Sequence, residues 1–132
     1  METYKVIIAG SREFENYEML KRVCDNALRN KESIEIVSGK ANGADELGEK
    51  YAKEKGHKIK EMRARWGEFG KSAGYRRNKE MAKYGDMLIA FWDGKSKGTK
   101  HMVNLAKEFG LKIKIVEYGK DEEKIPETNG LF

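Results

Sequence analysis

The sequence predicts a single α/β domain in which helices cover both faces of a five-stranded parallel sheet, giving three layers. Three observations predict this fold. Short apolar segments alternate with amphipathic segments along most of the chain, which is the pattern of parallel strands joined by helices. Glycine-bearing turns follow several of the apolar segments. The 132 residues suffice for one domain with a substantial core, but not for two.

Each element is predicted from its own pattern. The amphipathic segments place apolar residues three and four positions apart, and Gly56, Gly85 and Gly110 follow three of them, as glycine commonly does at helix ends. The expected strands are residues 5–9, 34–38, 57–62, 86–91 and 111–116. The expected helices are residues 16–30, 43–56, 75–84 and 99–109. The last helix is expected to bury Met102, Leu105, Ala106 and Phe109.

The strand order can also be inferred. Segments 5–9 and 86–91 are almost wholly apolar, as in central strands that helices cover on both faces. Lysine alternates with isoleucine in 57–62 and 111–116, and lysine is common on sheet edges. The order 3-2-1-4-5 satisfies both patterns and brings the turns at Gly10 and Gly94 to one crevice. A flavodoxin-like order is the alternative, and the apolar Ile36 and Val37 argue mildly against it.

Composition limits the classes of function. The net charge is +5, with the basic excess in residues 1–119 and an acidic balance in 120–132, so we expect a domain over 1–119 and a C-terminal tail over 120–132. The basic body is typical either of a phosphate-binding pocket with a solvated lysine-rich face or of a nucleic-acid surface. No segment approaches the roughly 20 apolar residues of a membrane span, so we expect no membrane partner. A single cysteine, Cys24, favours a reducing, cytoplasmic setting.

Two turns follow the first two strands. In the first, Gly10 permits close approach of a ligand, Ser11 can donate a hydrogen bond and Arg12 can bind a phosphate with two parallel bonds. Solvated arginine is the alternative interpretation of Arg12. The second turn exposes backbone amides at a helix start through its small residues, and its sequence contains Ser38, Gly39, Asn42, Gly43 and Asp45. Capping by Asn42 and Asp45 is the simpler explanation, but it does not account for the glycines.

The two later turns also precede helices. Residues 66–74 are interpreted as a glycine-containing loop that leads into Arg76, Arg77 and Asn78. Cations at a helix start oppose the helix dipole, so they indicate either an anionic ligand or neighbouring carboxylates such as Glu80. The fourth turn places glycines and polar groups before a helix for which Thr99 is the expected N-cap. Its candidate ligand-binding residues are Asp93, Gly94, Ser96, Gly98 and Thr99.

Two known phosphate motifs are excluded. Gly70, Lys71 and Ser72 imitate the end of a P-loop, but Arg65 stands where that motif needs a glycine. The dinucleotide fingerprint fails because Arg12 occupies the position of its second glycine. His57 and His101 are isolated from other metal-ligand residues, so we expect no metal site and no cofactor.

Four segments together resemble the SLOG superfamily, in particular its small YspA/YpsA-related branch. They are residues 10–12, 38–45, 77–78 and 91–99, and the resemblance extends over residues 4–116. It implies a Rossmann-like fold and binding of nucleotides or nucleotide-derived ligands of the ADP-ribose class. It also implies occurrence in bacterial, phage or mobile-element genomes. More distantly, the chain resembles DprA-like proteins and the LOG phosphoribohydrolases. Arg77 and Met81 have the spacing of the LOG arginine and methionine, but Met102 occupies the position of the LOG catalytic glutamate.

The leading hypothesis is therefore a nucleotide-binding protein that senses, sequesters or processes its ligand. Arg12, Arg77 and the amides of residues 39–42 and 98–99 would contact phosphate, while Asp45, Asn78 and Asp93 would contact ribose or base. A nucleotide N-glycosidase is the first alternative, with Arg77 on the phosphate and Asp45, Glu49 or Asp93 as the catalytic carboxylate. A single-stranded nucleic-acid-binding module is the second. Because relatives of this fold often pair through helices, we expect a homodimer.

Overall fold

The structure is a computed structural model that describes residues 2–118. The predicted tail, 120–132, and the predicted domain boundary at residue 119 lie outside the described residues.

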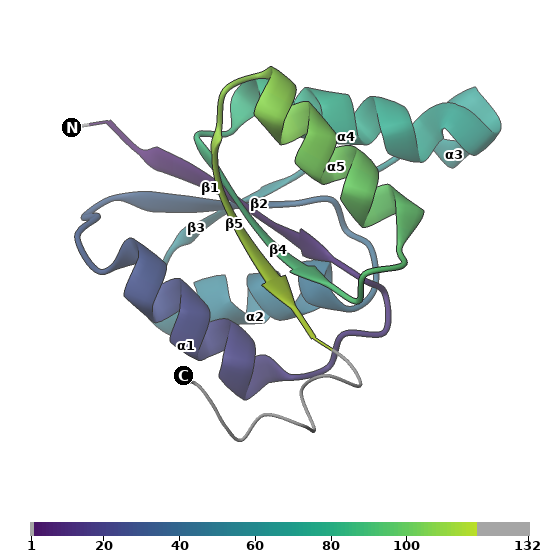
Figure 1. Cartoon of the computed structure of the whole chain (residues 1–132). Coiled ribbons are helices and arrows are strands. Elements are labelled where there is room, and N and C mark those ends of the chain that lie inside the picture. Colours follow the sequence, from purple (N-terminus) through teal and green to yellow (C-terminus); the bar gives the residue numbers. More distant parts are fainter. Residues whose placement is uncertain (1, 119–132) are drawn as a thin grey trace.

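The fold is a three-layer α/β sandwich around one five-stranded parallel sheet (Figure 1). The strand order is β3-β2-β1-β4-β5 and every pairing is parallel, which confirms the order predicted from the sequence. The two lysine-bearing strands lie at the edges. The strands are β1 (Tyr4–Gly10), β2 (Ile34–Ser38), β3 (Lys58–Glu61), β4 (Met87–Trp92) and β5 (Lys112–Glu117).

Two pairs of helices cover the sheet. Helices α1 and α2 pack on one face and helices α4 and α5 on the other, and α3 extends beyond the start of α4 (Figure 1). The helices are α1 (Tyr17–Leu28), α2 (Ala44–Lys55), α3 (Trp66–Phe69), α4 (Ala73–Tyr84) and α5 (Lys97–Glu108), with a 3₁₀ turn at Gly70–Ser72. No helix within residues 2–118 combines the length and apolar character needed to cross a bilayer.

The alternation of side chains along the central strands divides the core in two. In β1, Val6 and Ile8 face α1 and α2, whereas Ile7 and Ala9 face α4 and α5. Both sets are almost completely buried, so β1 is apolar on both faces as a central parallel strand requires. Cys24 lies in the first cluster and is fully buried, as its position on the apolar face of its helix predicted.

The structure corrects two details of the predicted elements. Residues 66–74 are not an irregular loop, because they contain helix α3 and the 3₁₀ turn that leads directly into α4. Phe109 does not contribute to the core. Helix α5 ends at Glu108, Phe109 is its C-cap, and 38% of Phe109 remains exposed. The one-residue shift of the helix end moves its side chain off the apolar face.

The adjacent strands β1 and β4 are in close contact near their carboxyl ends. Gly10 pairs with Phe91, and the amide of Ser11 donates to the Phe91 carbonyl oxygen at 3.0 Å. A Cβ atom added to Gly10 would lie 2.2 Å from that oxygen. The backbone of Phe91 is fixed in the sheet, so only glycine fits here. This contact places the first and fourth turns side by side.

We expect Gly10→Ala to lower the free energy of unfolding by about 2 kcal/mol or more, because overpacking against fixed backbone is costly. Gly67→Ala is the matched control, since no atom lies within 4 Å of a Cβ added at Gly67 and alanine is the better helix former. Urea denaturation measures both. Equal stability of Gly10→Ala and the unmodified chain would contradict the close strand approach.

Candidate functional site

A cavity of about 440 Å³ lies at the carboxyl ends of the central strands, where the order of strands reverses. Ligands of open α/β sheets commonly bind at this place. All four turns singled out in the sequence contribute to its wall. The predicted site residues that line it are Gly10, Ser11, Arg12, Asp45, Arg77, Asn78, Asp93, Ser96, Gly98 and Thr99. The structure thus brings these residues together, and their contact with a ligand stays a prediction.

Other predicted site residues do not line this cavity. Gly39 and Asn42 line a smaller neighbouring cavity, whereas Ser38, Gly43, Gly94 and Glu49 line neither. Gly43 has a structural reason to be glycine. Its φ is +79°, and a Cβ atom there would lie 2.4 Å from the carbonyl oxygen of Ser11. Gly43 therefore allows the second turn to pack against the first.

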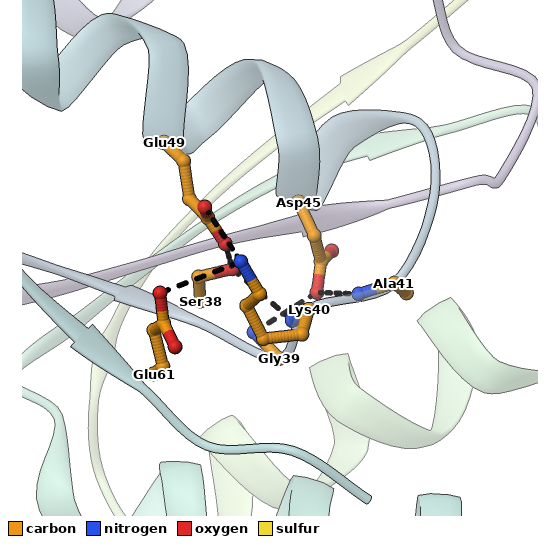
Figure 2. Close-up of polar contacts among 7 residues, drawn as sticks. All are labelled: Ser38, Gly39, Lys40, Ala41, Asp45, Glu49 and Glu61. Carbon is orange, nitrogen blue, oxygen red and sulfur yellow. Dashed lines mark hydrogen bonds and ion pairs between the residues drawn. The ribbon is translucent and has the colours of Figure 1, made fainter.

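Ser38 and Glu49 belong to a polar network beside the second turn (Figure 2). The Ser38 hydroxyl donates to Glu49 at 2.6 Å and accepts from the Lys40 amide at 3.1 Å. The Lys40 ammonium contacts Glu49 at 3.0 Å and Glu61 at 3.4 Å. Although burial opposes the change, the hydrogen bonds from Ser38 and Lys40 lower the pKa of Glu49. The Glu49 carboxylate therefore stabilises the turn and does not line the main cavity.

Asp45 occupies the amides that the sequence analysis assigned to phosphate. One carboxylate oxygen accepts from the amide of Gly39 at 3.0 Å and from that of Ala41 at 3.4 Å (Figure 2). A side chain of the protein therefore already satisfies these two amides in this structure, and their contact with phosphate, which stays a prediction, would require Asp45 to move. Asp45 is only 4% exposed. Burial raises its pKa to about 6, against the opposing effects of Arg77 and of the two amides.

Arg77 is held by the same turn. Its Nη1 donates a short hydrogen bond to the Gly39 carbonyl oxygen, and its Nε donates to Asn78 Oδ1 at 3.0 Å. Burial lowers the pKa of Arg77, the nearby Arg12 lowers it further, and Asp45 opposes both. Only part of the donor capacity of a guanidinium is used in these two bonds. The orientation of Arg77 is fixed, while further donors remain for a ligand.

Asn78 links helix α4, which also carries Arg77, to helix α5. Its side-chain nitrogen lies 3.4 Å from the Gly98 carbonyl oxygen and 3.2 Å from His101 Nδ1. Asn78 is buried, and its oxygen accepts from Arg77. These contacts make Asn78 a positioning residue for Arg77, in addition to its place on the cavity wall.

The fourth turn is built by Asp93. One carboxylate oxygen accepts from the amides of Lys95 and Ser96, both at 2.8 Å, and the Asp93 amide donates to the Ser11 hydroxyl at 3.1 Å. The hydrogen bond from Lys95 has the largest effect and lowers the pKa of Asp93. This turn makes Ser96, rather than the expected Thr99, the N-cap of α5, since the Ser96 hydroxyl accepts from the Thr99 amide at 3.3 Å.

The first two amides of α5 remain available. Among residues 2–118, no protein acceptor is found for the amides of Lys97 and Gly98. Gly98 lines the cavity, and no atom lies within 4 Å of a Cβ added to it. An open helix N-terminus of this kind favours anions through its amides and its dipole.

The cavity also has walls that the sequence analysis did not identify. Trp66 and Tyr75 line it and are 53% and 50% exposed, which is unusual for large aromatic side chains. The apolar Met81 and Met102 line it as well and are buried. The sequence contains no clear signal that either ring faces a site, and the packing of α3 and the start of α4 brings both to the cavity.

Comparison with known proteins assigns the family. Residues 4–69 match the family described as YspA, cpYpsA-related SLOG. The Gene 61 protein of Mycobacterium phage D29 is 32% identical over 116 residues, which cover 83% of this chain and 93% of the phage protein. This chain belongs to the YspA, cpYpsA-related SLOG family. The resemblance inferred from the four turns is confirmed, and one relative of this SLOG chain is a phage protein.

A solved structure agrees with the SLOG fold. DNA processing protein A (DprA) from Streptococcus pneumoniae superposes with a TM-score of 0.73 at 19% sequence identity. The match covers 91% of this chain and 52% of the DprA chain, so the SLOG chain spans about half the length of that protein. At this identity the likeness concerns the fold, and it confirms the Rossmann-like arrangement.

Replacing Asp45 by Asn should change how stability depends on pH. Because the folded-state pKa of Asp45 is raised from 3.8 to about 6, the folded protein binds the proton more tightly than the unfolded chain. The unfavourable contribution of this carboxylate is absent below about pH 3.8 and complete above about pH 6, where it reaches roughly 3 kcal/mol at most.

Urea denaturation of both proteins across this pH range tests the point. The free energy of unfolding of Asp45→Asn, minus that of the unmodified chain, should rise with pH between these values and then level off. The asparagine oxygen can still accept from the amides of Gly39 and Ala41, so the turn should persist. A difference that is independent of pH would show that Asp45 ionises normally.

Proposed function

We propose that this SLOG-family domain binds a nucleotide or nucleotide-derived ligand in the main cavity. The observation that carries the proposal is the pair of guanidinium groups, Arg12 and Arg77, on the wall of a cavity that also contains an open helix N-terminus. Guanidinium groups and free backbone amides are the groups with which proteins recognise phosphate.

The electrostatics of the pair support an anionic ligand. Burial and the charge of Arg12 both disfavour the charged form of Arg77. Asp45 gives partial compensation, but it is shared with two amides, and burial raises its pKa to about 6. No ion pair joins either arginine to a carboxylate among residues 2–118. A phosphate between them would relieve this repulsion.

The remaining walls suit a nucleoside. The exposed rings of Trp66 and Tyr75 can stack on a base, and the largely buried Met81 and Met102 contribute apolar atoms to the cavity wall. The volume of about 440 Å³ lies within the range of small-molecule sites, roughly 300–1,000 Å³. Membership of the SLOG family and a fold shared with a protein named for DNA processing both suggest a function related to nucleotides or nucleic acids.

Isothermal titration calorimetry with AMP, ADP-ribose, NAD and cyclic nucleotides tests the proposal. At least one should bind, and Arg12→Gln or Arg77→Gln should weaken it about tenfold or more, since a hydrogen bond to a charged group contributes about 1.5–3 kcal/mol. Arg12 is exposed and makes no side-chain hydrogen bond or ion pair within residues 2–118, so its variant should fold normally.

Arg76→Gln is the matched control. Arg76 lies on the same helix as Arg77 but contacts Ser72 and the Phe69 ring, and it lines neither cavity. Its substitution should leave affinity unchanged. Absence of binding by every nucleotide, or equal losses in all three variants, would contradict a phosphate site at Arg12 and Arg77.

A second function, hydrolysis of an N-glycosidic bond, is favoured by the buried carboxylate of Asp45. A pKa near 6 beside a cationic group in a cavity is typical of acid–base catalysts. Of the other two carboxylates expected from the sequence, Glu49 does not line the cavity and Asp93 is engaged in its turn. In such a reaction water would add to C1′ of the ribose while the base leaves with a proton.

Chromatography of nucleoside monophosphates incubated with the protein would reveal release of free base. If the domain is a hydrolase, Asp45→Asn should lower the rate by about 10²-fold or more, whereas Glu49→Gln should retain it. The rate should also change with pH around 6. Ligand binding without any release of base would eliminate this second function and leave the first.

A further inference from the structure

We infer that the ligand carries a second anionic group, bound in a smaller cavity beside the first. This inference rests on the proposed function, because it concerns the same ligand. The smaller cavity measures about 240 Å³ and shares Arg12, Ala41, Trp66 and Arg77 with the main one. The two spaces are therefore neighbours with a common wall. The smaller is below the range of about 300–1,000 Å³ for independent ligand sites, as expected of a subsite.

The lining of the smaller cavity is cationic. Its charged side chains are Arg12, Lys40, Arg63 and Arg77, and no carboxylate from residues 2–118 lines it. Lys40 is already neutralised, because its ammonium contacts Glu49 and Glu61 (Figure 2). Arg63 differs, since it makes no ion pair or side-chain hydrogen bond with the part of the chain that the structure describes. Within residues 2–118, none of Arg12, Arg63 and Arg77 forms an ion pair, and only Arg77 receives partial compensation, from Asp45.

The backbone of this subsite has an unusual conformation. Lys40 has a φ of +62°, and it is the only non-glycine residue with positive φ among residues 2–118. Such a conformation is unfavourable for a residue with a Cβ atom. It persists here because Ser38, Glu49 and Glu61 hold both the amide and the ammonium of Lys40. The network of Figure 2 therefore fixes the wall of the smaller cavity without placing a carboxylate in it.

The chemistry of the ligand follows from this arrangement. One anionic group lies at Arg12 and Arg77, and a second reaches Arg63 past the ring of Trp66. Compounds with this chemistry include nucleoside bisphosphates, molecules with a bridging diphosphate and short single strands of nucleic acid. Their common feature is the presence of two anionic groups. A nucleoside joins the two in a bisphosphate or a short strand, and a bridging oxygen joins them in a diphosphate.

Affinity measurements on the full chain test the inference with AMP as the one-anion reference. The two-anion probes are adenosine 3′,5′-bisphosphate, ADP-ribose and the dinucleotide pApA. We expect at least one of them to bind about tenfold tighter than AMP. If pApA binds most tightly, if longer strands bind still more tightly, and if their affinity falls steeply with added salt, the natural ligand is a nucleic acid. Tightest binding by either of the others would identify a small molecule.

Arg63→Gln should remove most of the difference in affinity between the two-anion probe and AMP, while leaving the affinity for AMP unchanged. Arg65→Gln is the matched control, because Arg65 lies two positions away, is 69% exposed, pairs with Glu68 and lines neither cavity. It should change neither affinity. The inference is overturned if no two-anion probe exceeds AMP, or if the gain survives in Arg63→Gln. Failure of AMP and every other nucleotide to bind would instead overturn the proposed function itself.

Discussion

The backbone of Gly39 is the constraint on which the rest of the site depends. Its amide donates to the buried carboxylate of Asp45, and its carbonyl oxygen accepts from Arg77. The end of β2, the start of α2 and the first turns of α4 are therefore joined through one residue. A Cβ atom at this position would lie 2.7 Å from Arg77 Nη1 and 2.8 Å from Asp45 Oδ2, so any other residue would displace these two side chains from their present positions. Arg77, which lines both cavities, is held in place by this contact.

This arrangement explains how Arg12 and Arg77 can lie near each other without an ion pair to a carboxylate that would occupy their guanidinium groups. Asp45 compensates Arg77 from the interior, where burial raises the pKa of the carboxylate, rather than from the cavity mouth. The acidic side chains of Glu49 and Glu61 are directed to Lys40 instead. Carboxylates thus stabilise the turns, while Arg12 and Arg63 stay without ion pairs among the described residues. We propose that this arrangement leaves Arg12 and Arg63 available to the anionic groups of a ligand.

Much of the fold could be predicted from the sequence, because the relevant forces are local. The apolar segments determine the strands, and the lysines of β3 and β5 indicate the sheet edges, so the order 3-2-1-4-5 was predictable. Convergence of the four turns followed from the parallel topology. The hydrogen-bond partners of individual backbone and side-chain groups could not be predicted in this way. Whether the Gly39 amide faces a ligand or Asp45 depends on side-chain geometry, and the exposed ring of Trp66 depends on a short helix that lacks an apolar period.

The most direct test of the central claim is a crystal structure with the tightest-binding nucleotide. We expect a phosphate within hydrogen-bonding distance of both Arg12 and Arg77, near the amides of Lys97 and Gly98, with Asp45 still hydrogen-bonded to the amide of Gly39. A nucleotide bound on another face of the domain would contradict it. So would a phosphate that displaces Asp45 from Gly39, because the turn would then be an anion site in its own right.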